Sequence, residues 1–140
     1  MVGGFAVNLQ GFNRATEDSD LWLKDDLQNR KNFRQAFNQL GYGDYPSFET
    51  MQFVPGCTQF YIAHGLVLDI MTSMKGLEHL SFDECLQMAT IADLGAIKVP
   101  FLHINHLIAN KRAVNRPKDQ IDVLELERIK KILGEQAGKL

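Results

Sequence analysis

Two aspartates separated by one residue, Asp18 and Asp20, constrain the fold of this chain more than any other feature of its sequence. They begin an apolar stretch around Trp22, whose alternation with polar residues predicts a strand over 18–24. Side chains two residues apart in a strand project from the same face, so the two carboxylates repel each other unless a cation or a proton lies between them. The pair is therefore either a Mg²⁺ site with oxygen ligands or a solvated pair at a strand end.

A pair of glycines, Gly3 and Gly4, comes shortly before these acids in the chain. The residues from Phe5 to Leu9 predict a short helix that ends near Gly11. Glycine lets the backbone approach an anion closely, and the free amide groups at the start of a helix attract negative charge. The glycine turn is therefore a candidate phosphate site.

A third acid interrupts a strand further along the chain. Two β-rich runs, 58–63 and 66–72, flank His64 and Gly65, which predicts a hairpin with a two-residue turn. The second run is apolar apart from Asp69, and an acid in such a run is costly unless it has a partner. Asp69 is either a strand-end residue that caps a loop or the third carboxylate of a metal site.

The glycine pair, the helix and loop after it, and the two acids in an apolar strand resemble the signature of the nucleotidyltransferase superfamily. That superfamily includes DNA polymerase beta, kanamycin nucleotidyltransferase and the small antitoxin-type nucleotidyltransferases. The stretches that are similar to its compact prokaryotic branch are Gly3-Gly4-Phe5-Ala6-Val7-Asn8, Asp18-Ser19-Asp20-Leu21-Trp22, Ile108-Ala109-Asn110-Lys111-Arg112, and Arg116-Pro117-Lys118-Asp119 with Asp122.

The resemblance covers nearly the whole chain and implies a fold. We expect a single domain over 1–140 of the α+β class, with a small mixed β-sheet and helices packed on one side. Only Met1 and Val2 precede the glycine turn, where this family has a strand, so we expect that the leading helix and strand are missing. The sheet edge that this leaves exposed favours the pairing of two chains in a homodimer.

The resemblance also implies an activity. We expect an enzyme that moves a nucleoside monophosphate from an NTP, with ATP as the first candidate, to a hydroxyl of a small molecule or a protein. Asp18, Asp20 and Asp69 would be the catalytic residues and would bind two Mg²⁺ ions, which clamp the attacking and leaving oxygens. Asp69 would also help to remove the proton of the attacking hydroxyl.

The expected nucleotide-binding residues are Gly3, Gly4, Lys111 and Lys118. The glycines would offer backbone amides to the phosphates, although many active members of the family have Ser where this chain has Gly4. One of the lysines would neutralise the triphosphate. The alternative is that both lysines belong to a solvated face, where they pair with nearby acids such as Asp119.

A toxin–antitoxin or defence system, in which the acceptor is a partner protein, is the biological setting that the resemblance suggests. A second hypothesis keeps the fold without the chemistry. The chain would then be a catalytically degenerate member that works as a binding or antitoxin module. The three acids favour the first hypothesis, and the short N-terminus favours the second.

Charge and hydropathy narrow the classes of partner. The formal net charge is −2 and the pI about 6.1, so the chain lacks the overall basic field that drives non-specific nucleic-acid binding. It has no apolar run of transmembrane length and no signal-peptide pattern, so we expect a cytoplasmic protein without a membrane partner. Cys57 and Cys85 lack zinc-type spacing and are expected to be reduced thiols in the core.

The remaining elements are scaffold. Apolar spacing predicts a helix over 26–40, and Ser81 with Glu84 predicts the capping box of another. A hairpin over 89–102 and two closing helices, from about Ile104 and from Pro117, complete the chain. Among the expected core residues are Leu40 and Leu124.

Overall fold

The computed structural model describes residues 1–139 and has an α+β fold, as the sequence predicts. The chain divides into two compact units. One contains residues 1–16 together with the chain from Met74 onward, and the other contains Glu17–Ser73. They are called the outer unit and the inserted unit below.

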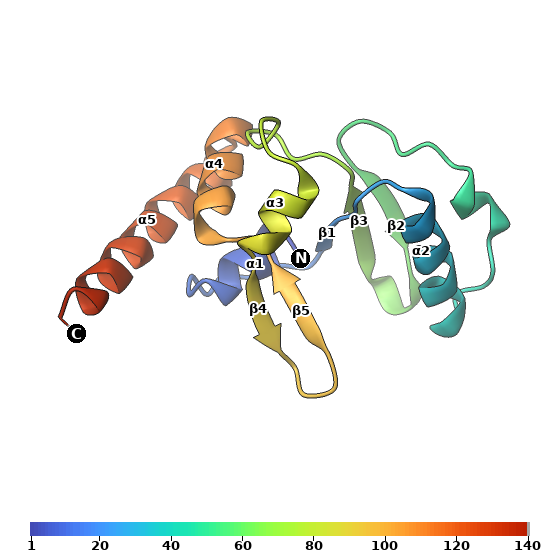
Figure 1. The fold of residues 1–140 in the computed structure, drawn as a ribbon, viewed down its shortest axis with the longest axis horizontal. Helices are drawn as coiled ribbons and strands as arrows, with labels where there is room; N and C mark the ends of the chain where they lie inside the picture. Colours follow the sequence, from blue (N-terminus) through green and yellow to red (C-terminus); the bar gives the residue numbers. More distant parts are fainter. Residues whose placement is uncertain (140) are drawn as a thin grey trace. The chain divides into compact units, whose positions relative to one another are not determined.

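The inserted unit is built on a mixed sheet of three strands, which are labelled in Figure 1. These are β1 (Ser19–Trp22), β2 (Thr58–Tyr61) and β3 (Val67–Met71), in the order β1-β3-β2. β3 pairs in parallel with β1 and antiparallel with β2. The small mixed sheet expected from the sequence is therefore present.

The connection between β2 and β3 differs in one detail from the expected two-residue turn. A short 3₁₀ turn, Ala63–Gly65, joins the strands. The amide of Ile62 donates a hydrogen bond to the carbonyl of Leu66 at 2.9 Å, which closes the hairpin around three residues. Two of these residues, His64 and Gly65, have positive φ angles of 64° and 75°. The extra residue lets the chain reverse with left-handed backbone at two positions in succession.

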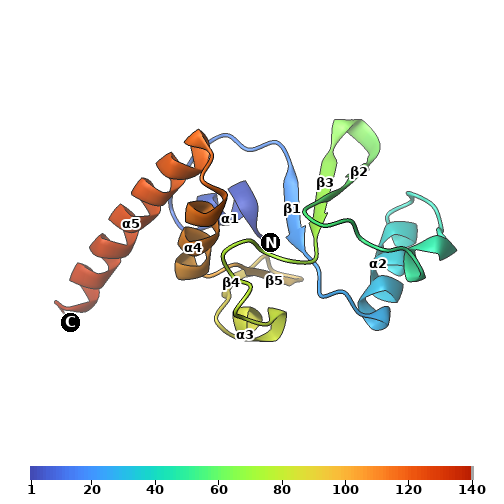
Figure 2. The same ribbon diagram turned by 90° about the horizontal axis from the view of Figure 1, so that it is seen from above.

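One face of this sheet is covered by aromatic side chains. Helix α2 (Leu27–Gln39), which Asp26 caps, and a 3₁₀ turn at Pro46–Glu49 pack against it, and Figure 2 shows α2 on one side of the strands. Phe60 of β2 lies within ring-contact distance of three other phenylalanines, with centroids 5.3 to 6.0 Å apart. These three rings belong to Phe33, Phe37 and Phe48. The expected core residue Leu40 instead lies just after the helix and is 69% exposed.

The outer unit contains the remaining helices and a two-stranded hairpin, visible in Figure 1. The capping box of Ser81 and Glu84 is present at the start of α3. The hairpin is antiparallel, as predicted. The elements are α1 (Gly3–Leu9), α3 (Phe82–Gln87), β4 (Thr90–Asp93), β5 (Lys98–Phe101), α4 (Ile104–Val114) and α5 (Pro117–Ala137).

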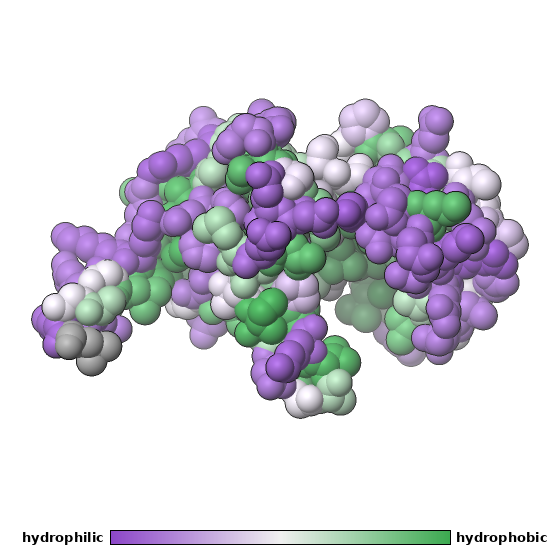
Figure 3. Space-filling model, in the orientation of Figure 1, coloured by the Kyte–Doolittle hydropathy of each residue, from purple (hydrophilic) through white to green (hydrophobic). Residues whose placement is uncertain are grey.

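The core of the outer unit lies where α1, α4 and α5 meet. Val7 of α1, Leu107 of α4 and Leu126 of α5 are all fully buried. Leu124, which was expected in this core, is 68% exposed because it lies on the outer face of α5. Figure 3 shows further hydrophobic surface on the β4–β5 hairpin, where Ile97 is 60% exposed. In residues 1–139, no helix is long and apolar enough to cross a lipid bilayer.

Candidate functional site

The three acids predicted as a site all belong to the inserted unit, and the strand register places two of them side by side. Asp20 of β1 lies directly opposite Asp69 of β3 in the parallel pair. Residues opposite each other in a ladder project from the same face. Asp18 lies in a bend just before β1, where the strand period does not apply. The backbone therefore places Asp20 and Asp69 on one face of the sheet, with Asp18 directly before the start of β1.

The alternation of residues along β3 determines which side chains share a face with Asp69. Ile70 of β3, next to Asp69, is 1% exposed and faces the opposite side, where the aromatic cluster around Phe60 lies. Leu68, the other neighbour of Asp69, lies opposite Phe60 in the antiparallel pair. Leu68 and Ile70 of β3 thus face α2, and Asp69 projects from the opposite face, together with Val67 and Met71 of the same strand. The position of Asp69 follows from the strand period and needs no distortion of the backbone.

Cys57 lies within electrostatic range of the three acids. Its pKa is raised to about 11 by partial burial, by the charge of Asp69 and a hydrogen bond with it, and by the charges of Asp20 and Asp18. All three acids therefore lie close enough to a single thiol to act on it electrostatically. The thiol stays protonated at neutral pH, because three nearby negative charges oppose its ionisation.

Cys57 was missed as a site residue, and its expected place in the core is wrong. The residue is exposed, whereas Cys85 is buried as predicted. Cys57 stands two residues before Gln59, which lies opposite Asp69 in the β2–β3 pair. If the alternation of side chains in β2 is continued to Cys57, its thiol falls on the same face of the sheet as Asp69. The residues before β2 show no strand pattern, so the sequence gave no reason to continue the alternation that far.

One oxygen of Asp69 lacks a partner. Its Oδ1 atom is buried and has no hydrogen bond among the described residues. A buried carboxylate oxygen without a partner costs free energy, and a bound cation or an incoming hydroxyl would satisfy it. Asp18 is exposed and Asp20 is half-buried, so solvent reaches the cluster.

The donor set suits a hard divalent cation, because carboxylate oxygens are the ligands that Mg²⁺ prefers. Within residues 1–139, however, no group of three or more His, Cys, Asp or Glu side chains is arranged to hold a metal ion. Three carboxylates without a cation repel one another, and side chains that spread apart are the expected result. The carboxylates have the right chemistry for Mg²⁺, but among the described residues they are not arranged to hold it in this conformation.

The glycine turn lies in the outer unit. Gly3 has a φ angle of 62° and already belongs to α1, so the helix begins two residues before the predicted Phe5 and includes both glycines. Gly4 is buried, and a Cβ atom at this position would overlap the hydroxyl of Thr16. The absence of a side chain at Gly4 is therefore explained by the close approach of Thr16.

Lys111 and Lys118, the two predicted phosphate-binding lysines, have different surroundings. Lys111 is 4% exposed, and its Nζ lies 3.1 Å from a carboxylate oxygen of both Asp119 and Asp122. The pairing with these acids was one of the two alternatives, but the solvated face that went with it is wrong, because both carboxylates are fully buried. Lys118 is exposed.

Arginines complete this buried ion cluster. Arg14, from the loop after α1, contacts Asp122 through Nε at 2.7 Å and through Nη2 at 2.9 Å. Arg116 binds Asp119 in the same two-pronged way. Burial would raise the pKa of the Asp119 carboxyl, but hydrogen bonds from Arg116 and Lys111 outweigh it and lower the pKa to about 2. Arg14 thereby ties the loop that follows α1 to helix α5.

Comparison of the chain with protein-family models, with curated proteins and with solved structures finds no match. The interpretation of the acid cluster consequently depends on its own geometry and chemistry.

Proposed function

We propose that this chain is a Mg²⁺-dependent nucleotidyltransferase that moves a nucleoside monophosphate from an NTP, ATP first, to a hydroxyl of a small molecule or a protein. The observation that carries the proposal is the pairing of Asp20 with Asp69 on one sheet face, with Asp69 Oδ1 buried and without a partner. Nucleotidyl transfer crowds negative charge at one phosphorus, and a set of carboxylates that can hold divalent cations meets that need.

Each acid has a role in this proposal. Asp18, Asp20 and Asp69 would hold Mg²⁺, which when bound neutralises the triphosphate and the charge that develops during transfer. One oxygen of Asp69 is shielded from water. That oxygen would orient the acceptor hydroxyl and draw its proton. The Cys57 thiol, which stays neutral beside the acids, would limit the number of negative charges at the site.

The nucleotide contacts in the outer unit rest on the family resemblance. Lys118 is the better candidate of the two lysines for the triphosphate, because it is exposed. Lys111 is already neutralised by two buried carboxylates. We further propose that the enzyme acts in the cytoplasm, in a toxin–antitoxin or defence pair with a protein partner.

Calorimetric titration of ATP, GTP, CTP and UTP, with and without Mg²⁺, tests this proposal. We expect one NTP to bind only with Mg²⁺, and Asp69→Asn to remove that binding. Glu135→Gln is the matched control, since it removes an exposed carboxylate of α5, outside the acid cluster. Saturable binding that survives in Asp69→Asn would contradict the proposed metal site.

A catalytically degenerate binding or antitoxin module is the second candidate. The ion pairs of Lys111 with Asp119 and Asp122 favour this second candidate, because a lysine that was expected to neutralise the triphosphate instead has a structural role. Absence of NTP binding by the folded wild-type chain under all conditions would select this candidate over the enzyme.

A further inference from the structure

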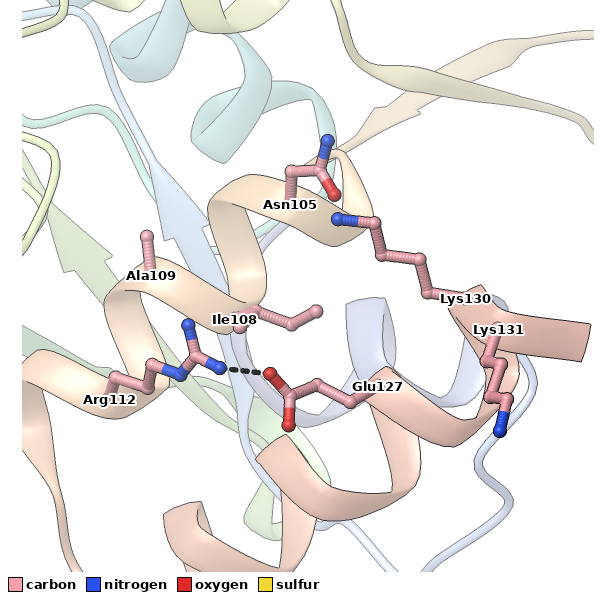
Figure 4. A pocket seen from close by; sticks show the side chains of 7 residues that line it. All are labelled: Asn105, Ile108, Ala109, Arg112, Glu127, Lys130 and Lys131. Carbon is pink, nitrogen blue, oxygen red and sulfur yellow. Dashed lines mark hydrogen bonds and ion pairs between the residues drawn. The ribbon is translucent and has the colours of Figure 1, made fainter. Parts of the chain in front are cut away.

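A pocket of about 470 Å³ lies between helices α4 and α5 of the outer unit, and neither the acid cluster nor the glycine turn contributes to it. Its volume falls within the range of roughly 300–1,000 Å³ that is typical of small-molecule sites. Figure 4 shows its lining side chains, which come from both helices. They are Asn105, Ile108, Ala109, Arg112, Glu127, Lys130 and Lys131.

The floor and the rim of this pocket differ in chemistry. Ile108, which is 5% exposed, points between the two helices in Figure 4 and supplies an apolar floor, whereas Ala109 points away from α5. The rim carries three basic side chains and one acidic one. A ligand that fits both parts has an apolar portion and a negatively charged portion.

The positive charge of the rim is only partly compensated. Arg112 forms an ion pair with Glu127, which is drawn as a dashed line in Figure 4. Lys130 and Lys131 have no ion-pair partner within residues 1–139, and Figure 4 shows Lys130 extending toward Asn105 across the pocket. The whole chain has a net charge of −2, so this local excess of positive charge runs against the balance of the protein. An excess of this kind attracts a compact anion.

We propose that the α4–α5 pocket binds a small phosphorylated organic molecule. Its phosphate would contact Lys130 and, after the side chain of Lys131 turns inward from its position in Figure 4, Lys131 as well, and its apolar part would lie on Ile108. A phosphate group gives two ammonium groups several oxygens to bind at once, and the side-chain amide of Asn105 offers a further hydrogen-bond donor. This inference is independent of the proposed transferase activity.

Phenyl phosphate and inorganic phosphate are suitable probes, because they differ only in the apolar part. Amide chemical shifts of ¹⁵N-labelled protein locate the binding, and calorimetry measures the affinity. The buffer contains EDTA, so that binding through Mg²⁺ at the acid cluster does not contribute. We expect saturable shifts at Asn105, Ala109 and Glu127, and tighter binding of phenyl phosphate than of inorganic phosphate.

Two sets of variants make the test specific. Lys130→Gln with Lys131→Gln should weaken phenyl phosphate binding about tenfold, because two charge-assisted contacts are lost. The control pair, Lys31→Gln with Lys98→Gln, has the same change in charge at exposed positions away from the pocket and should leave the affinity unchanged. Glu127→Gln should strengthen binding about threefold, because it removes the only acid of the rim and releases Arg112.

A rise in the affinity for phenyl phosphate in Glu127→Gln would indicate a specific site, because damage to the fold would lower the affinity. Equal weakening by the two lysine pairs would reduce the effect to general electrostatics and overturn the proposal. Equal affinity for the two probes would exclude the apolar floor from the site. Absence of shifts at the α4–α5 amides at millimolar phenyl phosphate would overturn the proposal as a whole.

Discussion

Asp20 and Asp69 lie opposite each other on neighbouring parallel strands, on the face of the sheet that the aromatic core leaves uncovered. Like charges directly opposite in a ladder are destabilising. The inserted unit thus contains a local conflict that a bound cation would relieve.

Substitution of Asp69 by Asn should relieve this conflict. We expect the free energy of unfolding to rise by about 0.5–1 kcal/mol, because the charge opposite Asp20 is lost while the shape of the side chain is kept. Urea unfolding of the metal-free protein measures the change. Glu135→Gln, which removes an exposed carboxylate, should leave the midpoint where it is. A clear loss of stability in Asp69→Asn would mean that this carboxylate is needed for folding.

Lys111→Met should destabilise the outer unit strongly. The variant leaves Asp119 and Asp122 fully buried without the ammonium group that contacts both. Removal of one partner from a buried ion cluster costs about 3–5 kcal/mol. The same substitution at the exposed Lys118 should change stability by about 0.5 kcal/mol or less. Equal effects of the two substitutions on the urea midpoint would contradict the structural role of Lys111.

The Asp119 carboxyl predicts how stability depends on acidity. Its pKa is lowered to about 2 in the folded state, from an ordinary value of 3.8. The unfolded chain therefore takes up a proton at this group before the folded chain does, and stability falls as the pH drops from about 4 toward 2. Above pH 4 the contribution of this group is fully present. Urea midpoints of the wild type and of Asp119→Asn across this range measure the effect, and the variant should show the shallower acid slope.

The contact between Gly4 and Thr16 predicts a rescue. Gly4→Ala places a Cβ atom where the Thr16 hydroxyl lies, and overpacking of this kind costs about 1–3 kcal/mol. Thr16→Gly removes the obstacle. Gly4→Ala should therefore cost much less unfolding free energy in the Thr16→Gly background than in the wild type. A thermodynamic cycle of the four proteins, built from unfolding free energies, gives the coupling between the two positions. Additive effects would show that glycine is required at position 4 for another reason.

Local patterns predicted the elements that carry the acids. The alternation around Asp18 and Asp20 and the apolar run around Asp69 were sufficient to place both strands, because a period of two determines which residues share a face. The hairpin from β2 to β3 followed from its Gly-containing turn, although the turn is one residue longer than expected. These features depend on neighbours in the sequence.

The features that sequence reasoning missed depend on residues brought together from a distance. Lys111 is buried because two carboxylates of the next helix meet its ammonium group, and nothing at position 111 itself indicates this. Leu124 was expected in the core by helical spacing, but α5 presents the face of Leu126 inward instead. Which face of a helix is buried depends on the elements that pack against it, and the sequence of that helix alone does not name them.

The division of the chain has a consequence for its synthesis. Residues 1–16 belong to the same unit as the chain from Met74 onward, and Val7 of α1 is buried in the unit that α4 and α5 complete. As the polypeptide leaves the ribosome, the strands of the inserted unit are finished first, while the apolar side of α1 still waits for helices that have not been translated. Helix α1 is thus made before the inserted unit but is buried only after α4 and α5 have been translated, so its apolar side stays exposed during that interval.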